Sequence, residues 1–180
     1  MLSLDKLILV PTADPPHKSG ADFAPAKARL DMLSLAFKDF GNAVVSDIEF
    51  KRQGKSYTYY TVNQIAALYP GARLFLIIGQ DQFVNFDSWY KWRDILNSVT
   101  LFAAARNENS KQIMIDSAKK IGIFDYVLSD APPVVVSSSE IRDHIICGKD
   151  ACDLLPADVL KYIKEKGLYL DCLRKIQCRY

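Results

Sequence analysis

A short apolar run followed by a glycine, a carboxylate and three aromatic residues is the stretch best suited to chemistry. The run Leu74–Ile78 predicts a strand buried on both faces, as in a parallel sheet. Gly79 and Asp81 follow it, at the edge of an α/β sheet where ligands bind. Three aromatic residues come next: Trp89, Tyr90 and Trp92. A nucleotide pocket is one interpretation, and a core strand before an amphipathic helix with inward-facing aromatics is the other.

Three consecutive serines near residue 140 form a second polar cluster. Ser137–Ser139 predict the N-cap of a helix, and Arg142 lies one turn beyond Ser139. Backbone N–H groups, hydroxyls and a guanidinium would converge there on an anion. Simple helix capping explains the same pattern, so both interpretations stand.

Three further cations lie at candidate positions. Lys18 follows a proline-rich loop and could meet a phosphate as a compact point charge, or be a solvated loop lysine. Arg106 lies where a strand meets its loop. Arg29 lies near the start of a helix, where a cation opposes the helix dipole. Arg29 therefore needs another partner, a carboxylate or a ligand phosphate.

A polar and aromatic segment, residues 49–61, carries hydroxyl groups beside an aromatic ring. Its central residues are Ser56, Tyr57 and Thr58. They can contact a ligand, or they can form the capping loop of a helix that begins at Thr61.

These residues must be positioned by alternating strands and helices. Strands are expected at residues 4–10, 43–48, 74–78, 100–105 and 126–128. Helices are expected at residues 24–40, 61–68, 110–121, after Ser139 and at 157–166. This alternation predicts an α/β protein with a doubly wound parallel sheet.

Composition limits the class of protein. The chain has 180 residues, 49% hydrophobic and 24% charged, with a net charge of +2. These values fit one globular domain and do not indicate nucleic acid or an anionic membrane as a partner. No apolar run reaches the roughly 18 residues of a membrane span, and the first residues read as a strand rather than a signal peptide. The four cysteines form no C-x-x-C pair, which predicts no zinc site and reduced thiols in a cytoplasmic protein.

Six motifs occur along the chain in one order. They are PPHK (15–18), AxxRLxML (26–33), SYTxxT (56–61), GQDxxxxFxxWYxW (79–92), SSSEIR (137–142) and LPxxVLxYIxExGLY (155–169). Together they resemble the bacterial nicotinate-nucleotide adenylyltransferase family, from Leu4 to about residue 170. The resemblance implies a Rossmann-like doubly wound fold of the nucleotidyltransferase type. It also implies one domain at residues 1–170, followed by a tail at 171–180.

The resemblance further implies a reaction. Nicotinate mononucleotide would attack the α-phosphate of ATP, giving nicotinate adenine dinucleotide and pyrophosphate on the pathway to NAD. Catalysis would be mostly positioning and charge neutralisation, with Mg²⁺ held by the ATP phosphates and water. The partners would be these two nucleotides, without nucleic acid or membrane, and a homo-oligomer stays open.

Roles follow for the residues that match the motifs. The nicotinate end would be bound by Tyr57, Thr58, Trp89 and Tyr90, with Trp89 stacked on the pyridine ring. The ATP end would be bound by Gly79, Asp81, Arg106, Ser137, Ser138 and Arg142. Lys18 and Arg142 are the catalytic candidates, because cations neutralise charge on reacting phosphates.

The chain departs from the family pattern in three places. The family begins with a strand and a GGTFDPxHxGH segment, and Met1 falls where its second strand begins. We therefore expect the first strand and helix to be missing, leaving neighbouring strands without a pairing partner. A start site placed too late is the explanation we favour, and a degenerate remnant is the alternative. Tyr60 replaces an acidic residue of many relatives, and Asn107-Glu108 replaces a frequent Pro-Gly.

Three functions are therefore open. The first is the adenylyltransferase itself, impaired or inactive as written. The second is a catalytically inactive nucleotide-binding remnant or partner subunit of the same fold. The third is another small adenylyl- or cytidylyltransferase, against which Trp89 and the Tyr57–Thr58 pair argue.

Overall fold

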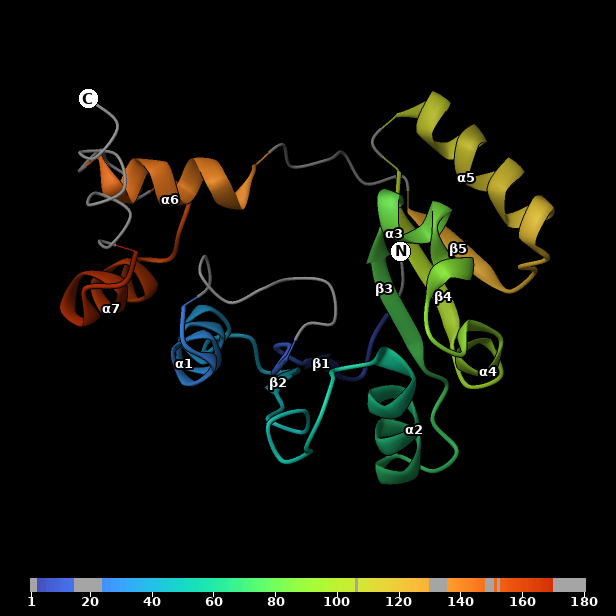
Figure 1. Ribbon diagram of the computed structural model, residues 1–180, viewed down its shortest axis with the longest axis horizontal. Coiled ribbons are helices and arrows are strands. Elements are labelled where there is room, and N and C mark those ends of the chain that lie inside the picture. Colours follow the sequence, from blue (N-terminus) through green and yellow to red (C-terminus); the bar gives the residue numbers. More distant parts are fainter. Residues whose placement is uncertain are drawn as a thin grey trace. The chain divides into compact units, whose positions relative to one another are not determined.

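The computed structural model describes residues 3–14, 24–105, 107–129, 136–147, 151 and 153–169. It divides into two compact units, each described here by itself (Figure 1). The first unit spans Ser56–Val134, and the second combines Leu2–Lys55 with Val135–Tyr180. A single domain over residues 1–170 stays a prediction, and the expected tail at 171–180 lies outside the described residues.

The first unit is built on a three-stranded parallel sheet. Its strands are β3 (Phe75–Gly79), β4 (Thr100–Ala104) and β5 (Tyr126–Ser129), in that order. Each begins and ends within one residue of the predicted bounds. Ile78 lies opposite Ala103, and Gly79 lies opposite Ala104. Because the strands are parallel, their carboxyl ends meet at one edge, where Gly79 ends β3.

Helices cover the face of this sheet that carries Leu101 and Ala103. They are α2 (Thr58–Leu68), α3 (Gln80–Val84), α4 (Trp92–Leu96) and α5 (Glu108–Ile121), with a 3₁₀ turn, η2 (Phe86–Ser88), between α3 and α4. Leu101 and Ala103 have no exposed surface. They belong to one apolar core with residues of the helices: Val62, Phe83, Phe86, Ile95, Met114 and Ala118. This core fixes the loops that follow β3 and β4.

The opposite face and the outer edge of β3 are more open. Ile77, in the middle of β3, is 51% exposed. Among the described residues, β3 pairs with β4 alone, and β1 pairs with β2 alone. Each of these two strands therefore has one strand partner within the described residues, and the absence of a first family strand stays a prediction.

The second unit pairs β1 (Leu7–Leu9) with β2 (Ala43–Val45), also in parallel. Its helices are α1 (Ala26–Ala36), α6 (Ser138–Ile146) and α7 (Ala157–Lys166). Helix α1 contacts α7, and the Tyr162 hydroxyl of α7 donates to the Asp31 carboxylate at 2.9 Å. Lys38 and Asp158 form an ion pair between the same segments.

Three elements of this unit, β1, β2 and α1, are shorter than predicted. β1 and β2 have three residues each, against seven and six predicted. Helix α1 begins at Ala26 because Pro25 takes the N-cap position, and it ends at Ala36, before the turn at residues 37–39. Helix α7 has the predicted bounds, since Pro156 precedes it and Gly167 ends it with φ 60°.

The α/β class with parallel strands is confirmed. Within the described ranges, no helix is long and apolar enough to cross a bilayer.

The core predicts a contrast between two leucines. Leu101→Ala should lower the free energy of unfolding by about 3 kcal/mol, because it leaves a cavity between sheet and helices. Leu68→Ala, on a residue that is 65% exposed, should lower it by about 0.5 kcal/mol or less. Urea denaturation followed by circular dichroism measures both, and equal losses would contradict the described core.

Candidate functional site

The end of β3 brings Gly79 and Asp81 to the carboxyl edge of the sheet. Gly79 is the N-cap of α3 with φ −77°, an ordinary extended conformation. A Cβ added to Gly79 would meet no atom within 4 Å, so neither backbone strain nor a protein contact requires glycine here. Asp81 is exposed in the first turn of α3, where a carboxylate complements the helix dipole. The backbone makes no tight turn at this edge, and ligand binding by Gly79 and Asp81 stays a prediction.

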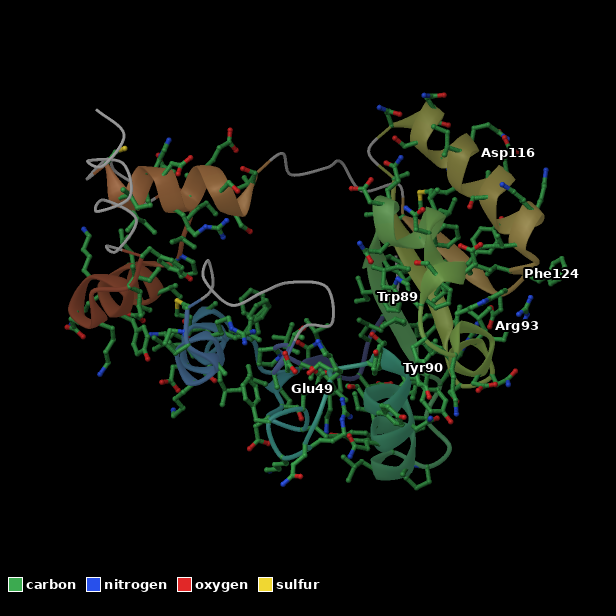
Figure 2. All side chains as sticks on the ribbon, viewed as in Figure 1. Glu49, Trp89, Tyr90, Arg93, Asp116 and Phe124 are labelled. Atoms are coloured by element: carbon green, nitrogen blue, oxygen red, sulfur yellow. The ribbon has the colours of Figure 1, made fainter. Side chains whose placement is uncertain are left out.

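Trp89 is anchored in the core on one side. It follows η2, and its ring lies 5.1 Å from the ring of Phe86, which is fully buried. Trp89 is half-buried and packs against the core, whereas Tyr90 is 41% exposed (Figure 2). Trp89 therefore packs inward, as one of the two interpretations predicted, and Tyr90 presents aromatic surface, while the nucleotide pocket stays a prediction.

Tyr90 stands among tyrosines from the start of α2. Ring centroids lie 4.7 Å from Tyr57, 5.9 Å from Tyr59 and 5.9 Å from Tyr60. The hydroxyls of Tyr60 and Tyr90 are 3.5 Å apart, and this hydrogen bond raises the pKa of Tyr90 above its ordinary value. The structure thus joins two predicted substrate contacts, Tyr57 and Tyr90, in one tyrosine cluster, made of Tyr57, Tyr59, Tyr60 and Tyr90.

The start of α2 corrects the sequence analysis. The helix begins at Thr58, not at Thr61, and Tyr57 is its N-cap in an extended conformation. Thr58 is therefore in the first helical turn rather than in a loop. Tyrosine and threonine are weak helix formers, and packing against Tyr90 overrides that propensity. Tyr59 and Tyr60 were not predicted as site residues, because their contact with Tyr90 depends on this helical turn.

The serine cluster of the second unit caps α6. The Ser137 hydroxyl accepts from the backbone N–H of Glu140 at 3.0 Å, and the Glu140 carboxylate accepts from the Ser137 N–H at 3.2 Å. Arg142 donates to the Ser139 hydroxyl at 3.2 Å. Ser137, Ser138 and Arg142 thus share the first turns of one helix. Capping is established, and anion binding by the same turn stays a prediction.

The phenol of Tyr169, just beyond α7, interacts electrostatically with the Arg142 guanidinium. Burial raises the pKa of Tyr169, and the charges of Arg142 and Arg29 oppose that rise. Tyr169 also has a left-handed backbone, with φ 71°. No local pattern connects this tyrosine with Arg142, because the two residues are 27 positions apart.

The loop after β1 is held by Arg29 and Glu49. The Arg29 guanidinium donates to the carbonyl oxygens of Thr12, Ala13 and Ala24, and the Ala13 N–H donates to the buried Glu49 carboxylate at 3.2 Å. We expected Arg29 to pair with a carboxylate or a phosphate, whereas these contacts join it to backbone oxygens. The guanidinium instead donates to backbone carbonyls of the loop after β1 and of Ala24, just before α1.

Two predicted site residues, Lys18 and Arg106, lie outside the described residues. Within the part of the chain that is described, no three His, Cys, Asp or Glu side chains are grouped to hold a metal ion.

The Tyr60–Tyr90 hydrogen bond predicts a titration change. Tyr60→Phe should lower the pKa of Tyr90 toward its ordinary value, because the hydroxyl that raises it is lost. NMR titration with ¹³Cζ-labelled tyrosine, assigned with Tyr90→Phe, measures the shift. Tyr126→Phe, which lies against Phe83 in the core, is the control and should leave the Tyr90 titration unchanged.

The capping box predicts unequal roles for adjacent serines. Ser137→Ala should lower the free energy of unfolding by about 1 kcal/mol, since it removes the N-cap acceptor of α6. Ser138→Ala, one residue later and exposed, should change it by about 0.5 kcal/mol or less. Chemical denaturation compares them, and an equal loss for both would argue against the cap.

Comparison with known proteins identifies the family and the fold of this chain. The family model described as cytidylyltransferase-like matches residues 1–144. A relative from Borreliella afzelii (strain PKo), named "Probable nicotinate-nucleotide adenylyltransferase", is 37% identical over 170 residues, or 94% of this chain and 84% of the relative. A relative of the same name from Thermotoga maritima is 32% identical, over 91% of this chain and 78% of its own length.

A solved structure shows the same fold. It is the Plasmodium falciparum nicotinic acid mononucleotide adenylyltransferase complexed with NaAD, which matches with a TM-score of 0.71 at 17% identity. The match covers 92% of this chain and 83% of that protein, and it confirms the predicted fold class. With relatives above 30% identity over most of their length, the chain belongs to the nicotinate-nucleotide adenylyltransferase family, within the cytidylyltransferase-like proteins.

Proposed function

We propose that this chain transfers the adenylyl group of ATP to nicotinate mononucleotide. The phosphate oxygen of the mononucleotide attacks the α-phosphorus of ATP, and the bond from that phosphorus to the bridging oxygen of the β-phosphate breaks. Pyrophosphate leaves, and nicotinate adenine dinucleotide forms for NAD synthesis. The observation that carries the proposal is the contact of Tyr57 with Tyr90 beside the anchored Trp89, within a chain of this family.

The aromatic surface suits a pyridine ring. Trp89 is fixed against Phe86, so stacking on it costs little ordering of the protein. Nicotinate carries a carboxylate, which hydroxyls and backbone N–H groups can bind, and Tyr57, Thr58 and Tyr90 supply such groups. We therefore propose these four residues as the binding site of the nicotinate end.

The phosphates require donors and cations. We propose that Ser137, Ser138 and Arg142 bind ATP phosphates at the start of α6, where backbone N–H groups favour anions. We propose Gly79, Asp81 and Arg106 as further contacts to ATP, and we propose Lys18 and Arg142 as the catalytic cations. Nucleotidyltransferases use a divalent metal, and we propose Mg²⁺ delivered as the Mg–ATP substrate. The reaction consumes ATP, so we propose the cytoplasm as its compartment.

Pyrophosphate release by the purified 180-residue chain tests the function. ATP, Mg²⁺ and nicotinate mononucleotide should give pyrophosphate and the dinucleotide, and nicotinamide mononucleotide should react more slowly. Binding of nicotinate mononucleotide without product would favour the inactive binding protein. If the chain neither binds nicotinate mononucleotide nor forms product, the assignment of this substrate is rejected.

Trp89→Ala tests the pyridine site itself. Loss of the stacking surface should raise the KM for nicotinate mononucleotide about tenfold or more and leave the KM for ATP unchanged. Phe124→Ala is the matched control, because Phe124 is 90% exposed and precedes β5, at the amino ends of the strands. An unchanged KM for nicotinate mononucleotide in Trp89→Ala would reject the role of Trp89.

A further inference from the structure

Lys91 has an unusual backbone for a lysine. It lies between Tyr90 and Trp92 with φ 52° and ψ 42°, in the left-handed region. This conformation is disfavoured for a residue with a Cβ, and it persists where surrounding contacts determine it. Lys91 is the N-cap of α4, so its conformation sets the direction in which the chain leaves Tyr90.

The side chain of Lys91 rests on two tyrosine rings. Its ammonium lies 4.6 Å from the ring centroid of Tyr59 and 5.7 Å from that of Tyr90. Both distances are within the range of an attractive cation–π interaction. The neighbouring Tyr59 phenol raises the pKa of Lys91 above its ordinary value, so the ammonium stays charged at neutral pH.

These contacts connect two segments that are distant in sequence. Tyr59 belongs to the first turn of α2, and Tyr90 belongs to the turn between η2 and α4. Tyr90 is 41% exposed and adjoins Trp89, so its position depends on contacts with the tyrosine cluster rather than on burial (Figure 2). The Lys91 ammonium is a charged group that contacts an aromatic ring on each side of this junction.

We propose that Lys91 is a positioning residue for the pyridine end of the site: through its contact with Tyr59 and Tyr90 it holds Tyr90 against α2, and with Tyr90 the adjoining Trp89 segment. The proposal rests on the proposed function, because pyridine binding is what gives the position of Trp89 and Tyr90 its importance. Lys91 acts through Tyr90, and no contact with substrate is assigned to it.

Three variants separate the charge from the backbone. Lys91→Met removes the ammonium and keeps an unbranched stem, Lys91→Arg keeps a cation, and Lys91→Gly removes the side chain while accepting a positive φ. With the full chain, Lys91→Met and Lys91→Gly should raise the KM for nicotinate mononucleotide about two- to fivefold, and Lys91→Arg should retain the wild-type value. The KM for ATP should not change in any of them.

Lys120→Met is the matched control, because Lys120 is an exposed lysine of α5 and the charge change is the same. A wild-type KM in Lys91→Met overturns the proposal. A raised KM in Lys91→Met with a wild-type KM in Lys91→Gly also overturns it, because the backbone conformation at residue 91, and not the ammonium, would then determine substrate binding. An equal rise in both KM values also overturns it, because a general structural defect would explain that result.

A second measurement needs no substrate. In a Trp92→Phe background, where Trp89 is the remaining tryptophan, acrylamide quenching of tryptophan fluorescence should increase in Lys91→Met and Lys91→Gly but not in Lys91→Arg, as Trp89 loosens. If the wild-type chain does not turn over nicotinate mononucleotide but quenching changes as stated, the proposed function fails and the positioning by Lys91 stands. Unchanged quenching in Lys91→Met and Lys91→Gly rejects the positioning, whatever the activity.

Discussion

Strand β4 is the constraint on which the first unit depends. It is hydrogen-bonded by β3 on one side and β5 on the other, and its Leu101 and Ala103 are fully buried. Helices can cover that face only if β4 keeps its register, and the register places Gly79 beside Ala104 at the carboxyl edge. Trp89 depends on the same core through Phe86. The anchoring of Trp89 and the position of Gly79 at the carboxyl edge are therefore both consequences of burying one short strand.

The second unit prepares its polar groups in a different way, by hydrogen bonds rather than by burial. Ser137 is committed to the cap of α6, and Ser139 holds the guanidinium of Arg142. An anion that approaches this turn would meet an arginine already oriented, which reduces the ordering that binding requires. In the loop after β1, hydrogen bonds likewise hold the backbone. Arg29 donates to the Thr12 carbonyl oxygen, and Glu49 accepts from the Ala13 N–H.

Local patterns predicted the elements that have strong local signals. The apolar run before Gly79 and the Pro156 and Gly167 boundaries of α7 were sufficient for β3 and α7. The predicted start of α2 was wrong because Thr-Tyr-Tyr-Thr has weak helix propensity, which the packing of Tyr59 against Tyr90 and of Val62 in the core outweighs. The family and its fold are confirmed by the comparisons, whereas the residue roles stay predictions. No pattern indicates a left-handed lysine, so Lys91 could be found only from the structure.

The outer edge of β3 has a practical consequence. Its backbone N–H and C=O groups have no strand partner on that side in the described structure, and the strand is apolar, with Ile77 half exposed. Such an edge can template pairing with the same strand of another molecule. Recovery of the purified chain should then depend on its concentration, and light scattering would be a necessary companion to every kinetic measurement.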